Sequence, residues 1–162
     1  MSSNLTTQKG KHMSTHTILI LDKEYHTQWT LKAFLESEQY IVVAVNTIEK
    51  ALQQFGESVI SGLITEYWID HARTLEIIRE VRMRFPEIYI LMLTNTELLE
   101  KEYEEIIHAG VDDYFLKPSS NKKVLLHLRK GLMQRNLFIQ RKGLDRGWIK
   151  SNSDKMFRSL QK

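Results

Sequence analysis

The most informative stretch of this 162-residue chain is a short apolar run that ends on a single carboxylate. Within residues 62–67, Leu63 and Ile64 are strong β-formers, and Glu66 follows them directly. In an open α/β sheet, binding sites are built at the edge where the strands end. We therefore expect Glu66 to lie at the centre of a site at this edge.

Three other apolar runs also end on polar groups. Carboxylate oxygens of this kind suit Mg²⁺. A hydroxyl and a lysine suit the oxygens of a phosphoryl group. We expect these groups to converge on Glu66. They are Asp22, Lys23 and Glu24 after the run 17–21, Thr94 after the run 88–93, and Lys117 after the run 114–116.

The elements that must position these groups alternate along the chain. Five strand-like runs alternate with five segments whose apolar residues recur at helical spacing. Alternation of this kind is typical of right-handed βαβ crossovers. The sequence therefore predicts an α/β fold with a flavodoxin-like, doubly wound, five-stranded parallel sheet flanked by five helices. The strand order 2-1-3-4-5 is the natural expectation.

Two of the predicted helices carry more detailed expectations. In the helix over 26–39, Trp29 is assigned to the core. The last helix begins at Asn121 and is expected to be longer than the others, with Phe138 or Ile139 still facing inward. Glycines at 143 and 147 are expected to break whatever follows.

Composition limits the class of protein. The chain is 42% hydrophobic and 27% charged, which is ordinary for a globular protein. It contains no cysteine, so disulfides and thiolate metal sites are excluded. No apolar run approaches the roughly 20 residues of a membrane span, and the polar first dozen residues lack a signal-like apolar core. We therefore expect a cytoplasmic protein that makes no membrane contact.

Charge divides the chain into two parts. Eighteen acidic and 11 basic residues precede position 119, whereas 12 basic and two acidic residues lie from 119 to the end. We predict a disordered leader over 1–15, one domain over 16–133 and a basic helical extension over 134–162. The basic part would bind nucleic acid or an acidic protein face, or would simply be a solvated helix.

Four motifs together resemble the receiver domain of two-component response regulators, in a degenerate, pseudo-receiver form. The resemblance covers roughly residues 16–133. Its most specific part is the last motif, in which residue types, order and position in the chain all fit. The motifs are Ile-Leu-Asp at 20–22, Leu-Ile-Thr-Glu-Tyr at 63–67, Leu-Thr at 93–94 and Ala-Gly-Val-Asp-Asp-Tyr-Phe-Leu-Lys-Pro at 109–118.

The resemblance implies a role for each matched position. In the family, an aspartate after the third strand accepts a phosphoryl group from a histidine kinase, and an acidic pair after the first strand holds Mg²⁺. Asp22 matches the first acid of that pair. Thr94 and Lys117 match the groups that hold the phosphoryl oxygens, and Tyr114 matches the aromatic residue that changes rotamer. The family also implies a cis peptide bond before Pro118.

Two positions depart from the family pattern. Glu66 stands where the phospho-accepting aspartate is expected, and Lys23 stands where the second acid is expected. A carboxylate one methylene longer misplaces the attacking oxygen, and a lysine brings a cation to the ion site. Lys23 would instead pair with Asp22 or Glu66, and Glu66 would reach toward Thr94 and Lys117.

These departures predict a signalling protein that is not an enzyme and that acts without phosphorylation through protein contacts. It would use no cofactor, or weak Mg²⁺ held by Asp22 and Glu66. The partner would be a kinase, an output protein or a second copy, bound through the fourth helix, fifth strand and fifth helix. The alternatives are a phosphorylatable regulator with an unusual Mg²⁺ site and a nucleic-acid-associated transcriptional regulator that uses the basic tail.

Overall fold

The computed structural model describes the backbone of residues 15–159 and the side chains of residues 15–143. All but the last residue of the predicted leader, 1–15, lies outside the described residues.

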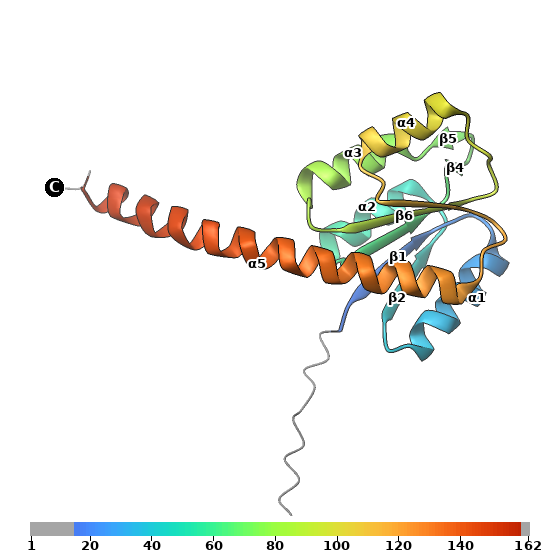
Figure 1. Cartoon of the computed structure of the whole chain (residues 1–162), viewed down its shortest axis with the longest axis horizontal. Helices are drawn as coiled ribbons and strands as arrows, with labels where there is room; N and C mark the ends of the chain where they lie inside the picture. The colour runs from blue at the N-terminus through green and yellow to red at the C-terminus, as the bar shows by residue number, and fades with distance from the viewer. Residues whose placement is uncertain (1–14, 160–162) are drawn as a thin grey trace, which may run out of the picture.

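A five-stranded parallel sheet forms the centre of the domain (Figure 1). Its order is β2-β1-β3-β6-β7, which is 2-1-3-4-5 when its five strands are numbered along the chain, so the predicted order is confirmed. Continuous apolar runs form these strands because both faces of the sheet are covered. The strands are β1 (Thr17–Leu21), β2 (Ile41–Val45), β3 (Gly62–Thr65), β6 (Tyr89–Thr94) and β7 (Asp113–Leu116).

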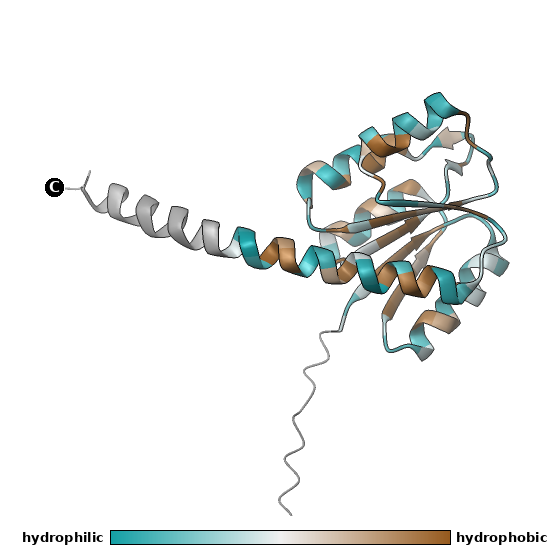
Figure 2. Cartoon of the chain, viewed as in Figure 1, coloured by the Kyte–Doolittle hydropathy of each residue, from teal (hydrophilic) through white to brown (hydrophobic). Residues whose placement is uncertain are grey.

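Five helices cover the two faces of the sheet. Helices α1 and α5 lie on one face, and α2, α3 and α4 on the other (Figure 1). Each face therefore has its own buried apolar cluster, and the strands appear as the most hydrophobic part of the fold (Figure 2). The helices are α1 (Tyr25–Ser37), α2 (Ile48–Glu57), α3 (Leu75–Arg84), α4 (Glu100–Ala109) and α5 (Asn121–Ser159).

A small hairpin that the sequence did not predict lies between β3 and α3. It consists of β4 (Trp68–Ile69) and β5 (Ala72–Arg73), paired antiparallel. Its two turn residues, Asp70 and His71, have φ of 47° and 66°. A two-residue turn with both φ values positive matches the twist of paired strands, and aspartate tolerates this conformation better than most residues.

The prediction that Trp29 belongs to the core is wrong, because 61% of the residue is exposed. Leu31 and Leu35 carry the buried face of α1 instead. Residues two apart on a helix point about 200° apart around its axis. Trp29 therefore cannot face the sheet while Leu31 does.

Helix α5 is also longer than expected. It passes through both glycines, 143 and 147, and ends at Ser159, so the predicted break is wrong. Glycine in a helix interior costs only about 1 kcal/mol relative to alanine, which weakens a helix without ending it. Phe138 and Ile139 are exposed, contrary to prediction, because this part of α5 faces Pro86 and Glu87 of the α3–β6 turn and not the sheet.

Alignment of α5 on the sheet depends on one glycine. A Cβ atom at Gly131 would overlap the ring of Tyr89, so its absence lets the helix approach β6 closely.

No helix in the described part of the chain is both long enough and apolar enough to cross a membrane.

Candidate functional site

The C-terminal edge of the sheet brings together the residues that the sequence singled out. Leu21 of β1 pairs in register with Thr65 of β3, so Asp22 and Glu66, the next residues along, lie at the same level. Asp22 and Glu66 are buried, with 5% and 8% of each residue exposed. The parallel register therefore builds the predicted site from strands that are distant in sequence.

Lys117 is the centre of this site. Its Nζ lies 2.6 Å from Oδ2 of Asp22, 2.9 Å from Oε2 of Glu66 and 3.5 Å from Oε2 of Glu24. Only 8% of the Lys117 side chain is exposed. One ammonium thus pairs with both buried carboxylates and with a third that is half exposed.

Burial and ion pairing have opposite effects on the pKa of Asp22, and also on the pKa of Lys117. Burial raises the pKa of Asp22, and the hydrogen bond from Lys117 only partly offsets this. Burial disfavours the charged form of Lys117, but hydrogen bonds to Asp22 and Glu66 outweigh that effect and raise the pKa of the lysine. Lys117 is therefore held firmly in its charged form.

Both carboxylate oxygens of Glu66 are engaged. One oxygen pairs with Lys117, and Oε1 accepts a hydrogen bond from the backbone N–H of Tyr67 at 2.7 Å. The hydroxyl of Thr94 accepts the backbone N–H of Thr96 at 3.1 Å. Among the described residues no hydrogen bond joins Glu66 to Thr94, so Glu66 reaches Lys117 as predicted but does not reach Thr94.

Lys23 does not enter the site. It forms an ion pair with Asp70 at the tip of the β4–β5 hairpin. The prediction that it pairs with Asp22 or Glu66 is therefore wrong. Those carboxylates are already satisfied by Lys117, and the backbone at position 23 directs the side chain outward, where 63% of it is exposed.

Tyr114 is half-buried beside the site. Its hydroxyl donates to the carbonyl of Thr96 at 2.9 Å and accepts the N–H of Leu98 at 3.4 Å. Burial raises the pKa of this hydroxyl. The side chain thus holds the β6–α4 connection, and the peptide bond before Pro118 is cis, as the family resemblance implied.

The residues present do not fit a divalent cation. Mg²⁺ needs several free oxygen ligands, but Asp22 and Glu66 are both bonded to an ammonium, and Lys23 supplies no oxygen ligand and points away from the site. No group of three or more His, Cys, Asp or Glu side chains in the described part of the chain is arranged to hold a metal. The donor set therefore argues against a built magnesium site.

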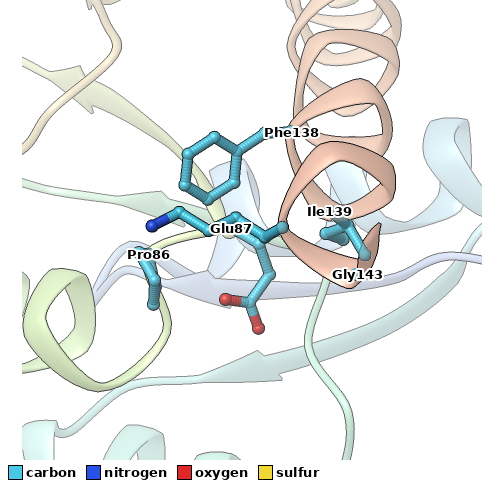
Figure 3. Close-up of a pocket in the computed structure, with 6 residues that line it drawn as sticks. Pro86, Glu87, Phe138, Ile139 and Gly143 are labelled. Atoms are coloured by element: carbon cyan, nitrogen blue, oxygen red, sulfur yellow. The ribbon is translucent and has the colours of Figure 1, made fainter. Parts of the chain in front are cut away.

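Cavities lie beside this site and away from it. One of 390 Å³ lies between α1 and the β7–α5 connection and reaches Lys117, but Glu66 does not line it. Another, of 190 Å³, lies between the α3–β6 turn and α5 (Figure 3). It is lined by Pro86, Glu87, Phe138, Ile139, Lys142 and Gly143, and it belongs to a different part of the molecule.

Sequence reasoning missed a second polar cluster at the opposite edge of the sheet. Asp112 forms ion pairs with Arg82 at 2.8 Å and Arg135 at 2.6 Å. Asp113 lies in β7 and accepts the hydroxyl of Tyr89 at 2.5 Å. The partners are far apart in sequence, so local spacing gave no signal for this cluster.

Comparison with known proteins decides the family. The profile of the response regulator receiver domain matches residues 18–129. The chain belongs to this family. A putative NtrX-like response regulator of Rickettsia bellii is 24% identical over 148 residues, which cover 87% of this chain and 31% of the relative. The two-component response regulator ORR5 of rice is 27% identical over 104 residues, 62% of this chain and 77% of the relative.

Solved structures show the same fold. A CheY-like receiver domain from Methanospirillum hungatei superimposes with a TM-score of 0.71 at 22% identity, covering 76% of this chain and 98% of that one. NtrX from Brucella abortus gives 0.71 at 19% identity, covering 80% of this chain and 29% of that one. This receiver chain thus spans about a third of the NtrX-type proteins that it matches.

Membership of the family sets the general role. The chain is a response regulator receiver in two-component signalling. Receivers of this family interact with kinases and output domains and typically bind Mg²⁺ at the phosphorylation site. Several relatives are named as transcriptional regulators, among them ResD of Bacillus subtilis.

Proposed function

We propose that this receiver does not accept a phosphoryl group and that it signals through protein contacts alone. The observation that carries the proposal is the bonding of Glu66, which occupies the acceptor position. One of its oxygens is paired with Lys117 and the other with the backbone of Tyr67. These bonds hold both oxygens in place and oppose the movement that attack on phosphorus would require.

Chain length at position 66 supports the same conclusion. In-line transfer requires the attacking atom within about 3–3.5 Å of phosphorus, and small misplacements are costly. Glutamate extends the carboxylate by one methylene beyond aspartate and brings it onto Lys117 itself. In this proposal the Glu66–Lys117 pair replaces the phosphorylated state instead of preceding it.

Loss of Mg²⁺ forms part of the proposal. Asp22 and Glu66, the predicted ligands, share one ammonium, and Lys23 replaces the second acid. A cation would have to displace Lys117 from two buried carboxylates. We therefore propose that the pocket uses no cofactor and binds Mg²⁺ weakly, if at all, at millimolar concentration.

The proposed contact surface is the face of α4, β7 and α5. Large apolar side chains are exposed there, namely Leu99, Tyr103, Leu116 and Leu126, with 42–73% of each residue exposed. Exposed apolar side chains on these three elements support an interaction site there. A kinase, an output protein or a second copy of the chain is the proposed partner, and nucleic acid bound by the basic residues of α5 is the alternative.

Intact mass after treatment with acetyl phosphate and Mg²⁺ tests the proposal. We expect no phosphate adduct on the wild-type chain. The double variant Glu66→Asp/Lys23→Asp, which restores the family's residues at both positions, is the positive control for phosphorylation. A stoichiometric adduct on the wild-type chain would overturn the proposal and favour a phosphorylatable regulator.

Fluorescence gives an independent readout of Mg²⁺. Trp68 lies two residues from Glu66 and is partly exposed. We expect no change in its emission with Mg²⁺ or beryllofluoride, and the Trp68→Phe variant identifies the signal from the other tryptophans. A saturable response lost in that variant would show that the pocket still binds the ion.

A further inference from the structure

The β4–β5 hairpin lies directly after Glu66 and is fixed to the rest of the domain on two sides. At its tip, Asp70 forms an ion pair with Lys23 of the β1–α1 connection. At its base, Arg73 forms an ion pair with Glu105 of α4 at 2.6 Å. The hairpin therefore spans from the loop that carries Asp22 to the helix beyond β6.

Bonds beneath the hairpin join it to the backbone of the acceptor position. The hydroxyl of Thr74, at the start of α3, donates to the carbonyl of Glu66 at 2.7 Å. Tyr67 is fully buried, and its hydroxyl accepts a hydrogen bond from Arg73 at 3.4 Å. The hairpin is thus packed onto the site and does not extend freely into solvent.

The carboxylates of Glu66 and Asp22 are largely shielded from solvent. Only 11% of the Glu66 side chain is exposed, and 7% of that of Asp22. The 390 Å³ cavity beside Lys117 does not include Glu66 among its lining residues. The hairpin begins two residues after Glu66, and its tip is bonded to Lys23, the residue that follows Asp22.

We propose that the β4–β5 hairpin, fastened by the Lys23–Asp70 ion pair, controls access to position 66, and that Lys23 and Asp70 are positioning residues of this site. The inference rests on the proposed function and extends it, because it gives a second barrier to phosphodonors besides the identity of Glu66. A phosphodonor side chain from a partner protein needs the same approach that the hairpin covers.

The expected size of the effect follows from the exposure of the pair. The Lys23 and Asp70 side chains are 63% and 52% exposed. An exposed ion pair shifts an equilibrium by about two- to five-fold. Breaking this pair should therefore raise the access rate by about that factor.

A single thiol measures access directly, since the chain has no cysteine. We would make Glu66→Cys and follow its reaction with Ellman's reagent. In that reaction the thiolate attacks one sulfur of the reagent, forms a mixed disulfide and releases one thionitrobenzoate anion. We would compare this variant with versions that also carry Asp70→Asn or Lys23→Gln, all at the same pH of about 8.

Both added substitutions should accelerate the reaction by about two- to five-fold. They change the local charge in opposite directions, so an electrostatic effect on the thiol would change the two rates in opposite directions. Asparagine tolerates the positive φ of position 70, so the turn is kept. Arg129→Gln, which breaks an exposed ion pair with Glu38 at 2.6 Å elsewhere, is the matched control and should leave the rate unchanged.

Unchanged or oppositely changed rates would overturn the role of the hairpin. This experiment involves no phosphate, so its failure leaves the proposed function standing. Conversely, a phosphate adduct on the wild-type chain would overturn the proposed function whatever the thiol rates show.

Discussion

At the C-terminal edge of the sheet one lysine forms ion pairs with three carboxylates, whereas at the N-terminal edge two arginines form ion pairs with one aspartate. The ammonium of Lys117 bonds to three acidic side chains. Arg82, by contrast, donates to Asp112 and also to the backbone carbonyls of Gly110 and Ile88. The first edge has more acceptors than donors, and the second has more donors than acidic partners.

This difference distinguishes the functional pocket at the C-terminal edge from the cluster at the N-terminal edge, which fastens elements together. An excess of buried acid held by a single cation is a pocket whose charge depends on one side chain. An excess of guanidinium donors, satisfied by carbonyl oxygens, fastens elements together. Arg135 belongs to the second cluster, where it holds α5 to Asp112 close to the point at which the helix leaves the sheet.

Removing the cation from the pocket should have the largest effect. Lys117→Met leaves Asp22 and Glu66 buried and unpaired, and we expect a loss of about 3–5 kcal/mol in the free energy of unfolding. Urea unfolding at neutral pH measures it. Lys23→Met is the matched control, since its pair with Asp70 is exposed, and it should cost under about 1 kcal/mol. Equal losses would show that Lys117 is not the centre of the site.

Neutralising the acid at the other edge should cost less. In Asp112→Asn the remaining carbonyl oxygen still accepts the N–H of Ile90, now 2.8 Å from Oδ2, but the oxygen that faces Arg135 becomes a donor. We expect a loss of about 1–2 kcal/mol. Hydrogen exchange should also rise in α5 after Arg135. Unchanged exchange in that segment would mean that the cluster does not anchor the helix.

We expect alkaline pH to lower the free energy of unfolding through groups at both edges of the sheet. The loss should be smaller than that caused by removing Lys117, because a neutral amine still donates hydrogen bonds. The folded state raises the pKa of Lys117, so the stability it contributes is present below its ordinary pKa of 10.5 and is lost as pH rises through the folded value. Burial raises the pKa of Tyr89, which keeps its proton while the unfolded chain ionises near 10.

Urea unfolding between about pH 8 and about pH 11 can assign these two contributions. Lys117→Met should remove the lysine part of the alkaline loss, and Tyr89→Phe the tyrosine part. If neither variant flattens the profile, the alkaline loss comes from other groups.

Much of the site could be predicted because its residues follow strands. Apolar runs ending on Asp22, Glu66, Thr94 and Lys117 were enough to place all four at one edge, since parallel strands end together. Apolar spacing was less decisive on helices, since it assigned the exposed Trp29 to the core. A broad apolar face has several acceptable orientations, and only packing against the sheet selected the Leu31 side.

By itself the sequence determined the alternation of the five sheet strands with five helices, the family and the polar residues that end the strands at one edge. These depend on local patterns: strand runs, helical spacing and a ten-residue motif at 109–118. Only the tertiary structure decided which cation pairs with the buried carboxylates. Lys23 is adjacent in sequence to Asp22, yet Lys117 fills the role from 95 residues away.

The reason is geometric. Successive residues leave a strand end in different directions, whereas side chains at the ends of neighbouring strands point into the same space. Lys23 therefore lies on the outside and pairs with Asp70. Lys117 follows β7, beyond β6, and its long side chain reaches across the shared edge to bring Nζ to both Asp22 and Glu66.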